Sequence, residues 1–158
     1  MTRMARMVAG VYQGLLILHV LCAMVWFGGT LGLGREARQA IQLERSYARL
    51  RIAEIVRSHR RAAIAALLVL VSGVAIALIT PGGFGALGVR YHIALSLTLA
   101  WVLLCLGAVR SLLGRLAREL DGERPLVEAA RMVRRLAGLM GMQHALFGAC
   151  LVLMLWRL

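Results

Sequence analysis

Four long runs of apolar residues dominate the chain, and polar residues collect in the segments between them. A helix rises about 1.5 Å per residue, so about 20 apolar residues cross a hydrocarbon core about 30 Å thick. Helices are expected because an isolated strand would leave its backbone groups unpaired in lipid. The predicted spans are 8–33, 62–79, 89–109 and 137–155. Residues 1–158 are therefore predicted to form one all-α integral membrane four-helix bundle.

The segments between the spans carry their own helical pattern. Apolar residues recur at helical spacing between Leu43 and Ile55, which predicts a helix that continues into the second span. The third helix is expected to run past the membrane until Asp121-Gly122, and Pro125 is suited to the first turn of the next helix. Small residues at 141, 145 and 148 share one face of the fourth span and favour close helix packing.

Composition strengthens the membrane interpretation and indicates a topology. The chain is 61% hydrophobic and carries a net charge of +12, with arginine supplying all 19 basic residues. Eight arginines lie between the first two spans and seven between the third and fourth. By the positive-inside rule these loops are cytoplasmic, and both termini lie on the non-cytoplasmic side. The basic loops are interpreted as topology signals that contact anionic lipid, with no nucleic-acid partner, in a multi-pass protein of a bacterial-type inner membrane.

Two histidines lie near the middle of predicted spans, where an ionisable side chain is costly and indicates function. Counted from the outer edge, His19 is about 15 Å deep and His144 about 18 Å deep, so their depths match. His92 is expected about 5 Å below the same edge. His59 lies beside Arg60, at the cytoplasmic boundary, where a solvated or lipid-facing position is expected.

The matched imidazoles suggest a bound heme or metal. A bis-imidazole heme needs two facing histidines, each with its second ring nitrogen bonded to a carbonyl or hydroxyl. His19 and His144 are the predicted metal ligands, and His92 is the alternative second ligand. A heme held by one histidine, with an open sixth position, is a third arrangement. A hydrogen bond to a neighbouring helix is the structural alternative for each histidine, and Trp26 is expected to line the cofactor cavity.

Copper is the competing metal. Met24 and Met140 are soft ligands of the kind that Cu(I) prefers, and Met140 lies one turn from His144. Catalytic residues stay unknown, because the chain contains no hydrolase, zinc-protease, phosphate-loop or dinucleotide motif. No acidic residue lies within a predicted span, which argues against a carboxylate proton relay.

The segment 18–29, LHVLCAMVWFGG, resembles the first helix of two related families of small membrane proteins. These are the HemJ-type protoporphyrinogen oxidases and the CopD copper-resistance membrane domain. The shared pattern is a histidine, an aromatic residue seven positions later, a glycine, and an arginine past the helix end. His19, Trp26 and Arg35 match it here. The resemblance extends through the first three spans, with Gly73 in the second and Tyr91-His92 opening the third.

The HemJ resemblance implies heme b held by the first-helix histidine and by a lysine after the third-helix histidine. Ala94 occupies the position of that lysine, and this chain has none. His19 carries over as a ligand, so His92 or His144 must replace the lysine, or the site differs. The CopD resemblance implies copper uptake across the inner membrane, whereas the outer loop here is short and poor in ligands.

These observations predict a heme b-binding integral membrane redox protein, with cofactor-binding residues His19, His144, His92, Trp26 and Arg35. Electron transfer or a heme-dependent oxidation is expected, coupled to quinone or to a membrane redox partner. Protoporphyrinogen oxidation would make it an oxidoreductase. The alternatives are a CopD-like copper transport or handling protein and a non-catalytic accessory subunit of a membrane complex. A homo-oligomer or a larger assembly is open in each case.

Overall fold

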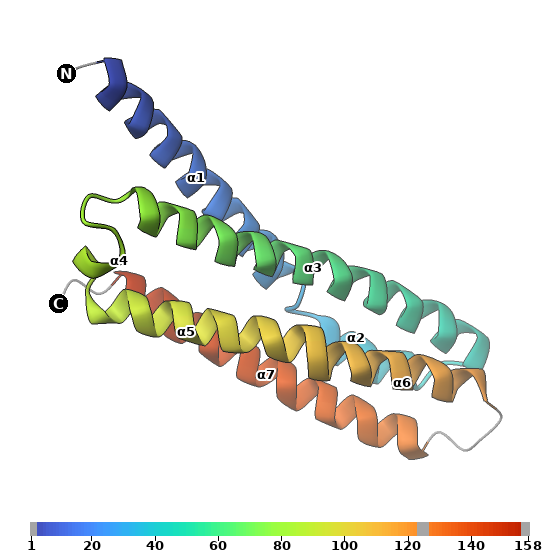
Figure 1. The fold of residues 1–158 in the computed structure, drawn as a ribbon. Helices are drawn as coiled ribbons and strands as arrows, with labels where there is room; N and C mark the ends of the chain where they lie inside the picture. The colour runs from blue at the N-terminus through green and yellow to red at the C-terminus, as the bar shows by residue number, and fades with distance from the viewer. Residues whose placement is uncertain (1–2, 123–126, 156–158) are drawn as a thin grey trace.

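The computed structural model describes residues 3–122 and 127–155, which form helices and turns with no strand among them. Four helical stretches are long and apolar enough to cross a membrane, which confirms the all-α, multi-pass bundle. The elements in Figure 1 are α1 (Arg3–Gly28), α2 (Leu33–Ala40), α3 (Arg45–Ile79), α4 (Gly83–Ala86), α5 (Val89–Leu104), the π-helix η1 (Cys105–Val109), α6 (Arg110–Asp121) and α7 (Val127–Leu155).

The first helix ends earlier than the predicted span 8–33, because the chain breaks after Gly28. A Cβ at Gly29 would lie 2.9 Å from the Val25 carbonyl oxygen and 3.3 Å from Cβ of Ala62 on α3. The Thr30 hydroxyl donates to the Trp26 and Phe27 carbonyls of the last α1 turn, where helix carbonyls lack their usual partners. Glycine at the close approach and threonine at the cap therefore separate α1 from α2.

The other predicted helix extensions are confirmed. Helix α3 runs without interruption from Arg45 to Ile79, and α6 ends at Asp121. The predicted helix start at Pro125 lies outside the described residues. The outer connection between α3 and α5 turns at Gly82, whose φ of +85° is in the left-handed region that favours glycine.

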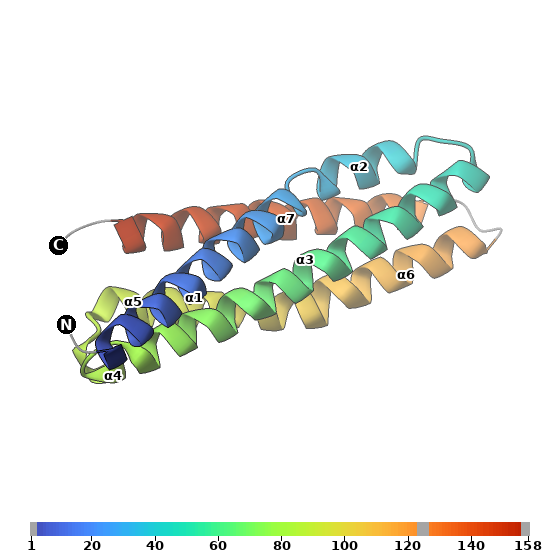
Figure 2. The same cartoon turned by 90° about the horizontal axis from the view of Figure 1, so that it is seen from above.

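The long helices are not arranged as four equal members of a bundle. Helices α3, α5–α6 and α7 run side by side over most of their length, whereas α1 crosses α3 and its N-terminal half diverges from the others (Figures 1 and 2). Helix α1 packs mainly on α3, and the short α2 packs on α3 and α7. The three-helix unit is therefore completed by α2 at one end and only partly by α1 at the other.

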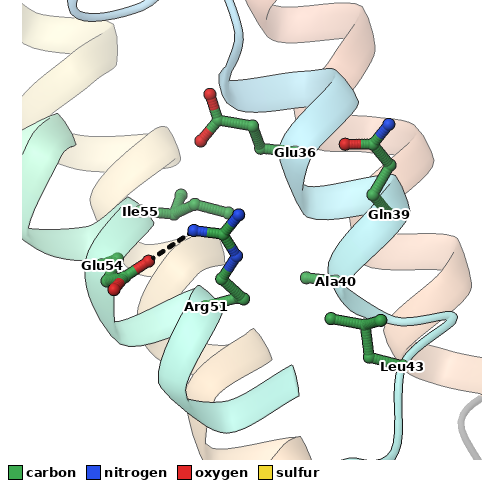
Figure 3. A pocket seen from close by; sticks show the side chains of 7 residues that line it. All are labelled: Glu36, Gln39, Ala40, Leu43, Arg51, Glu54 and Ile55. Atoms are coloured by element: carbon green, nitrogen blue, oxygen red, sulfur yellow. Dashed lines mark hydrogen bonds and ion pairs between the residues drawn. The ribbon is translucent and has the colours of Figure 1, made fainter. Parts of the chain in front are cut away.

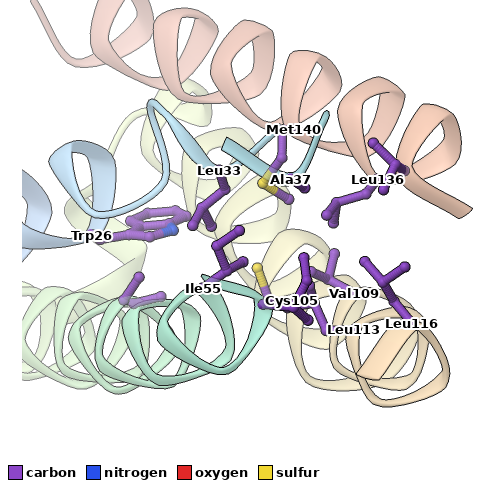
Figure 4. Packing of buried hydrophobic residues seen from close by; sticks show 14 of the residues in the cluster. Trp26, Leu33, Ala37, Ile55, Cys105, Val109, Leu113, Leu116, Leu136 and Met140 are labelled. Carbon is purple, nitrogen blue, oxygen red and sulfur yellow. The ribbon is translucent and has the colours of Figure 1, made fainter. Parts of the chain in front are cut away.

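The hydrophobic core extends from Trp26 and Trp101 in the apolar spans to the arginine-rich end of the molecule, where α2, α3, α6 and α7 meet (Figure 4). Leu116 and Leu136 are fully buried there. Along α1, by contrast, apolar side chains such as Ile17 and Met24 are more than half exposed. An exposed apolar helix of this length is expected to face lipid. The packed core thus lies between α2, α3, α5–α6 and α7, whereas much of α1 stays outside it.

The small-residue face predicted on the fourth span does not mediate helix packing. Gly141 and Gly148 have open space where a Cβ would lie. The close approach of α7 is instead made by Ala137, whose Cα lies 3.1 Å from the Cβ position of Gly34 on α2. The small residues at 141, 145 and 148 share one face of α7, but a different face of α7 packs on α2.

Arg49 joins α3 to the end of α6. Its guanidinium donates to the Leu120 carbonyl at 2.7 Å and to the Asp121 carbonyl at 3.0 Å. These carbonyls have no partner within α6, and a cation there is also stabilised by the negative end of the helix dipole. Arg49 therefore acts as a C-terminal cap supplied by a neighbouring helix.

We expect Arg49→Ala to lower the free energy of unfolding by about 1 kcal/mol, because two charge-assisted bonds are lost at a partly exposed site. Thermal unfolding of the detergent-solubilised protein measures the change. Arg51→Ala is the matched control, since Arg51 makes only an exposed bond to Glu54, one turn away on the same helix. An equal loss in both variants would contradict the capping role.

Candidate functional site: His19 between α1 and α3

His19 projects from α1 toward α3 and is half-buried between the two helices. Its Nδ1 lies 3.0 Å from the Ser72 hydroxyl oxygen. Its ring rests on Gly73, where an added Cβ would be 3.2 Å from the imidazole Cε1. Ser72 and Gly73 therefore form a cradle on α3: one residue bonds the imidazole and the other leaves room for it.

The hydrogen bonds around Ser72 define the tautomer of His19. The Ser72 hydroxyl donates to the Leu68 carbonyl at 2.6 Å, with the Val69 carbonyl at 3.1 Å. A hydroxyl has one proton, so Ser72 must accept from the imidazole. Nδ1 then carries the hydrogen, and Nε2 keeps its lone pair.

His144 lies elsewhere, at the crossing of α1 and α7. Its ring meets the edge of the Phe27 ring, with centroids 5.5 Å apart. Phe147 stacks on the other side of this cluster, 4.5 Å from the Phe27 centroid. The His144 Nε2 is buried and has no hydrogen-bond partner among the described residues. The environment of His144 is therefore aromatic and distinct from the His19 cradle.

His19 and His144 contact different points along α1 and α3. His144 contacts Phe27, which follows His19 by eight residues, or about 12 Å along α1. Helix α1 is inclined to the bundle (Figure 1), so residues counted along α1 do not correspond one to one with depth along α7. Two imidazoles on one iron lie about 4 Å apart, so His19 and His144 do not fit as an axial pair in this arrangement.

His92, the alternative second ligand, lies in the first turn of α5. It is exposed, and its ring lies 6.4 Å from that of Phe84 in the outer connection. On α5 the buried side is marked by Ala94 and Trp101. His92 precedes Ala94 by two residues, or about 200° of helix rotation, and so points away from the bundle interior. Of the three predicted ligands, His19 alone is held by a polar side chain of another helix.

Trp26 and Arg35, the remaining predicted cofactor residues, lie apart from each other. Trp26 is buried at the end of α1 and meets Phe147 edge-on, with centroids 5.7 Å apart. Its indole Nε1 has no partner in the described part of the chain. Arg35 is exposed on α2, beyond the turn that ends α1. Trp26 therefore belongs to the α1–α7 aromatic cluster, and Arg35 to the surface.

The soft-ligand set considered for copper is dispersed. Met24 is 66% exposed on α1, whereas Met140 is buried in the core. Cys105 and Cys22 are buried free thiols. Across residues 3–122 and 127–155, no group of three or more histidine, cysteine or acidic residues is placed to hold a metal ion.

Two buried polar features escaped the sequence-based reasoning. His59, expected to face solvent or lipid, is buried, and its Nε2 donates to the Cys105 carbonyl at 3.4 Å. Gln143, only 1% exposed, donates from Nε2 to the Thr30 hydroxyl at 2.9 Å. Both residues are buried because of the rotation of their helices about the helix axis. A segment whose neighbouring residues are apolar on every face does not reveal that rotation. A lone polar residue within an apolar run was the available signal for Gln143.

Two cavities lie away from the histidines. One, of about 210 Å³, separates α2 from α3 near the arginine-rich end and is lined by charged and apolar residues (Figure 3). Its charged groups are Glu36, Arg51 and Glu54, with Arg51 donating to Glu54 at 2.9 Å. The other lies along α6. Neither is lined by a histidine.

Comparisons with protein-family models, curated proteins and solved structures found no match for this chain.

Proposed function

We propose that the chain is an integral membrane redox protein that holds heme b through His19. Electron transfer, or a heme-dependent oxidation such as that of protoporphyrinogen, is the proposed activity, in a bacterial-type inner membrane with quinone or another membrane redox protein as partner. The observation that carries the proposal is the hydrogen bond between His19 Nδ1 and Ser72. This bond orients the imidazole ring and leaves Nε2 as the nitrogen that would bind iron.

The surroundings of His19 suit a metal-binding imidazole. Histidine ligands are usually oriented by a hydrogen bond to the ring nitrogen that does not bind the metal, and Ser72 makes that bond here. The apolar faces of α1 and α3 exclude water from the ring. Heme, when bound, would supply one-electron chemistry at a potential set by its ligands and burial. The geometry favours one protein ligand over the bis-histidine arrangement.

The first test is the absorption spectrum of the protein purified from bacterial membranes in mild detergent. We expect a Soret band, separate α and β bands after reduction, and one heme per chain. Colourless protein with stoichiometric copper would support copper handling instead. Colourless protein without metal, even after incubation with hemin, would support an accessory subunit. Either colourless outcome contradicts the proposal.

Ser72→Ala tests the orienting bond. Removing the hydroxyl is expected to weaken hemin affinity by about 10- to 100-fold, the usual cost of losing such a partner. Titration of the apoprotein with hemin measures it. Thr98→Ala is the matched control, because Thr98 likewise bonds a carbonyl of its own helix but lies on α5. Unchanged affinity in Ser72→Ala would show that Ser72 does not orient a ligand.

A further inference from the structure

A shallow groove of about 450 Å³ follows one face of the third long helix, where α5 passes through η1 into α6. Residues at helical spacing line it: Leu106, Gly107, Arg110, Ser111, Gly114 and Arg118. They belong to one continuous helical stretch and share one face of it, which is not the face carrying the buried Leu113 and Leu116. The groove lies outside the packed core.

Two local features make this face concave. At Gly107 and Gly114 nothing lies within 4 Å of where a Cβ would be, so both glycines leave open space along the helix. Within η1 the Arg110 N–H bonds the Cys105 carbonyl five residues back, which widens the turn. One extra residue in a turn rotates the following helix by about 100°. This rotation sets the direction in which Arg110 and the residues after it point.

The groove carries positive charge and a hydroxyl donor, and no carboxylate lines it. Arg110 and Arg118 are exposed, and neither forms an ion pair within the described residues. The nearby Asp121 lies 3.5 Å from Arg49 instead. Two guanidinium groups and the Ser111 hydroxyl are donors suited to phosphate oxygens.

The two ends of the groove differ in polarity. Leu106, 40% exposed, belongs to the apolar segment that crosses the membrane, whereas Arg110 is the first charged residue after it. Under the positive-inside topology this is the cytoplasmic interface. A site with an apolar end in hydrocarbon and a basic end at the interface has the same polarity as a phospholipid. We propose that the groove binds one anionic phospholipid, with its phosphate on Arg110, Ser111 and Arg118.

Native mass spectrometry of the delipidated, detergent-solubilised protein tests the proposal. Phosphatidylglycerol and phosphatidylcholine of equal chain length are the probes. We expect one tightly bound phosphatidylglycerol per chain and weaker retention of phosphatidylcholine. Arg110→Gln with Arg118→Gln should weaken phosphatidylglycerol binding roughly 30-fold, because each basic residue near a membrane surface contributes about a fivefold change in affinity. Equal retention of the two lipids by the unmodified chain would overturn the proposal.

The control is Arg134→Gln with Arg135→Gln, which removes two exposed arginines from α7. It should keep phosphatidylglycerol affinity, whereas an equal loss would show general surface charge and overturn a defined site. Gly114→Leu keeps every charge but fills the groove, and the open space at Gly114 allows the variant to fold. It should weaken binding at least tenfold; unchanged binding would overturn the groove. Displacement of the lipid by millimolar inorganic phosphate would identify a free-anion site instead.

Discussion

Replacing Leu116 by alanine is expected to destabilise the bundle by about 2–5 kcal/mol, the usual cost of emptying a buried leucine position. Leu116 is completely buried on α6, among apolar residues of α3 and α7 in the arginine-rich half of the molecule. Water surrounds this half under the positive-inside topology, so apolar burial here is driven by the hydrophobic effect. Thermal unfolding in detergent, followed by far-ultraviolet circular dichroism, measures the loss.

Leu103→Ala provides the comparison. Leu103 is 62% exposed on α5, within the apolar segment, and truncating it removes lipid contacts rather than packed neighbours. Its expected effect on unfolding is within about 0.5 kcal/mol. If Leu103→Ala were as costly as Leu116→Ala, burial in the packed core would not account for the cost of emptying the Leu116 position.

Helix existence could be predicted from the sequence because hydrocarbon imposes a length and an apolar composition on each span. The extension of α3 from Arg45 was also predictable, since its buried positions recur at helical spacing among charges. The end of α1 was not. Hydropathy continues across Gly29, and the break depends on the approach of Ala62, a contact between helices.

The candidate site was predictable only in part, because hydropathy marks a residue in a span but not its contacts with other helices. His19 stands out because a lone imidazole in an apolar run is costly. Its partner Ser72 follows from the register and rotation of α1 on α3, which hydropathy does not encode. His92 illustrates the same limit: its depth could be estimated from the chain, but its direction required the helix rotation that buries Ala94. Sequence reasoning identified a residue type and position, and the structure identified its bonding.

His19→Ala is expected to abolish heme binding, because the proposed site offers iron one protein ligand. The Soret band of the purified protein should fall to background, while circular dichroism keeps its helical signal. His92→Ala is the matched control, since it removes an exposed imidazole from the outer side of α5. It should keep the full Soret band. Loss of the Soret band in His92→Ala, with the band retained in His19→Ala, would show that His92 and not His19 is the heme ligand.

Gly73→Leu tests the same site with every histidine in place. A Cβ at Gly73 would already lie 3.2 Å from the His19 Cε1, and a leucine side chain needs the volume that the ring occupies. The imidazole must therefore move away from Ser72, and heme binding should be lost as in His19→Ala. Nitrogen-15 NMR of labelled histidine in the apoprotein gives an independent measurement: the protonated Nδ1 signal of His19 should change in Gly73→Leu and stay constant in Gly85→Leu, where the space is open. An unchanged His19 signal in Gly73→Leu would show that Ser72 and Gly73 do not position the ring. A changed signal with a retained Soret band would show that heme binding does not depend on His19.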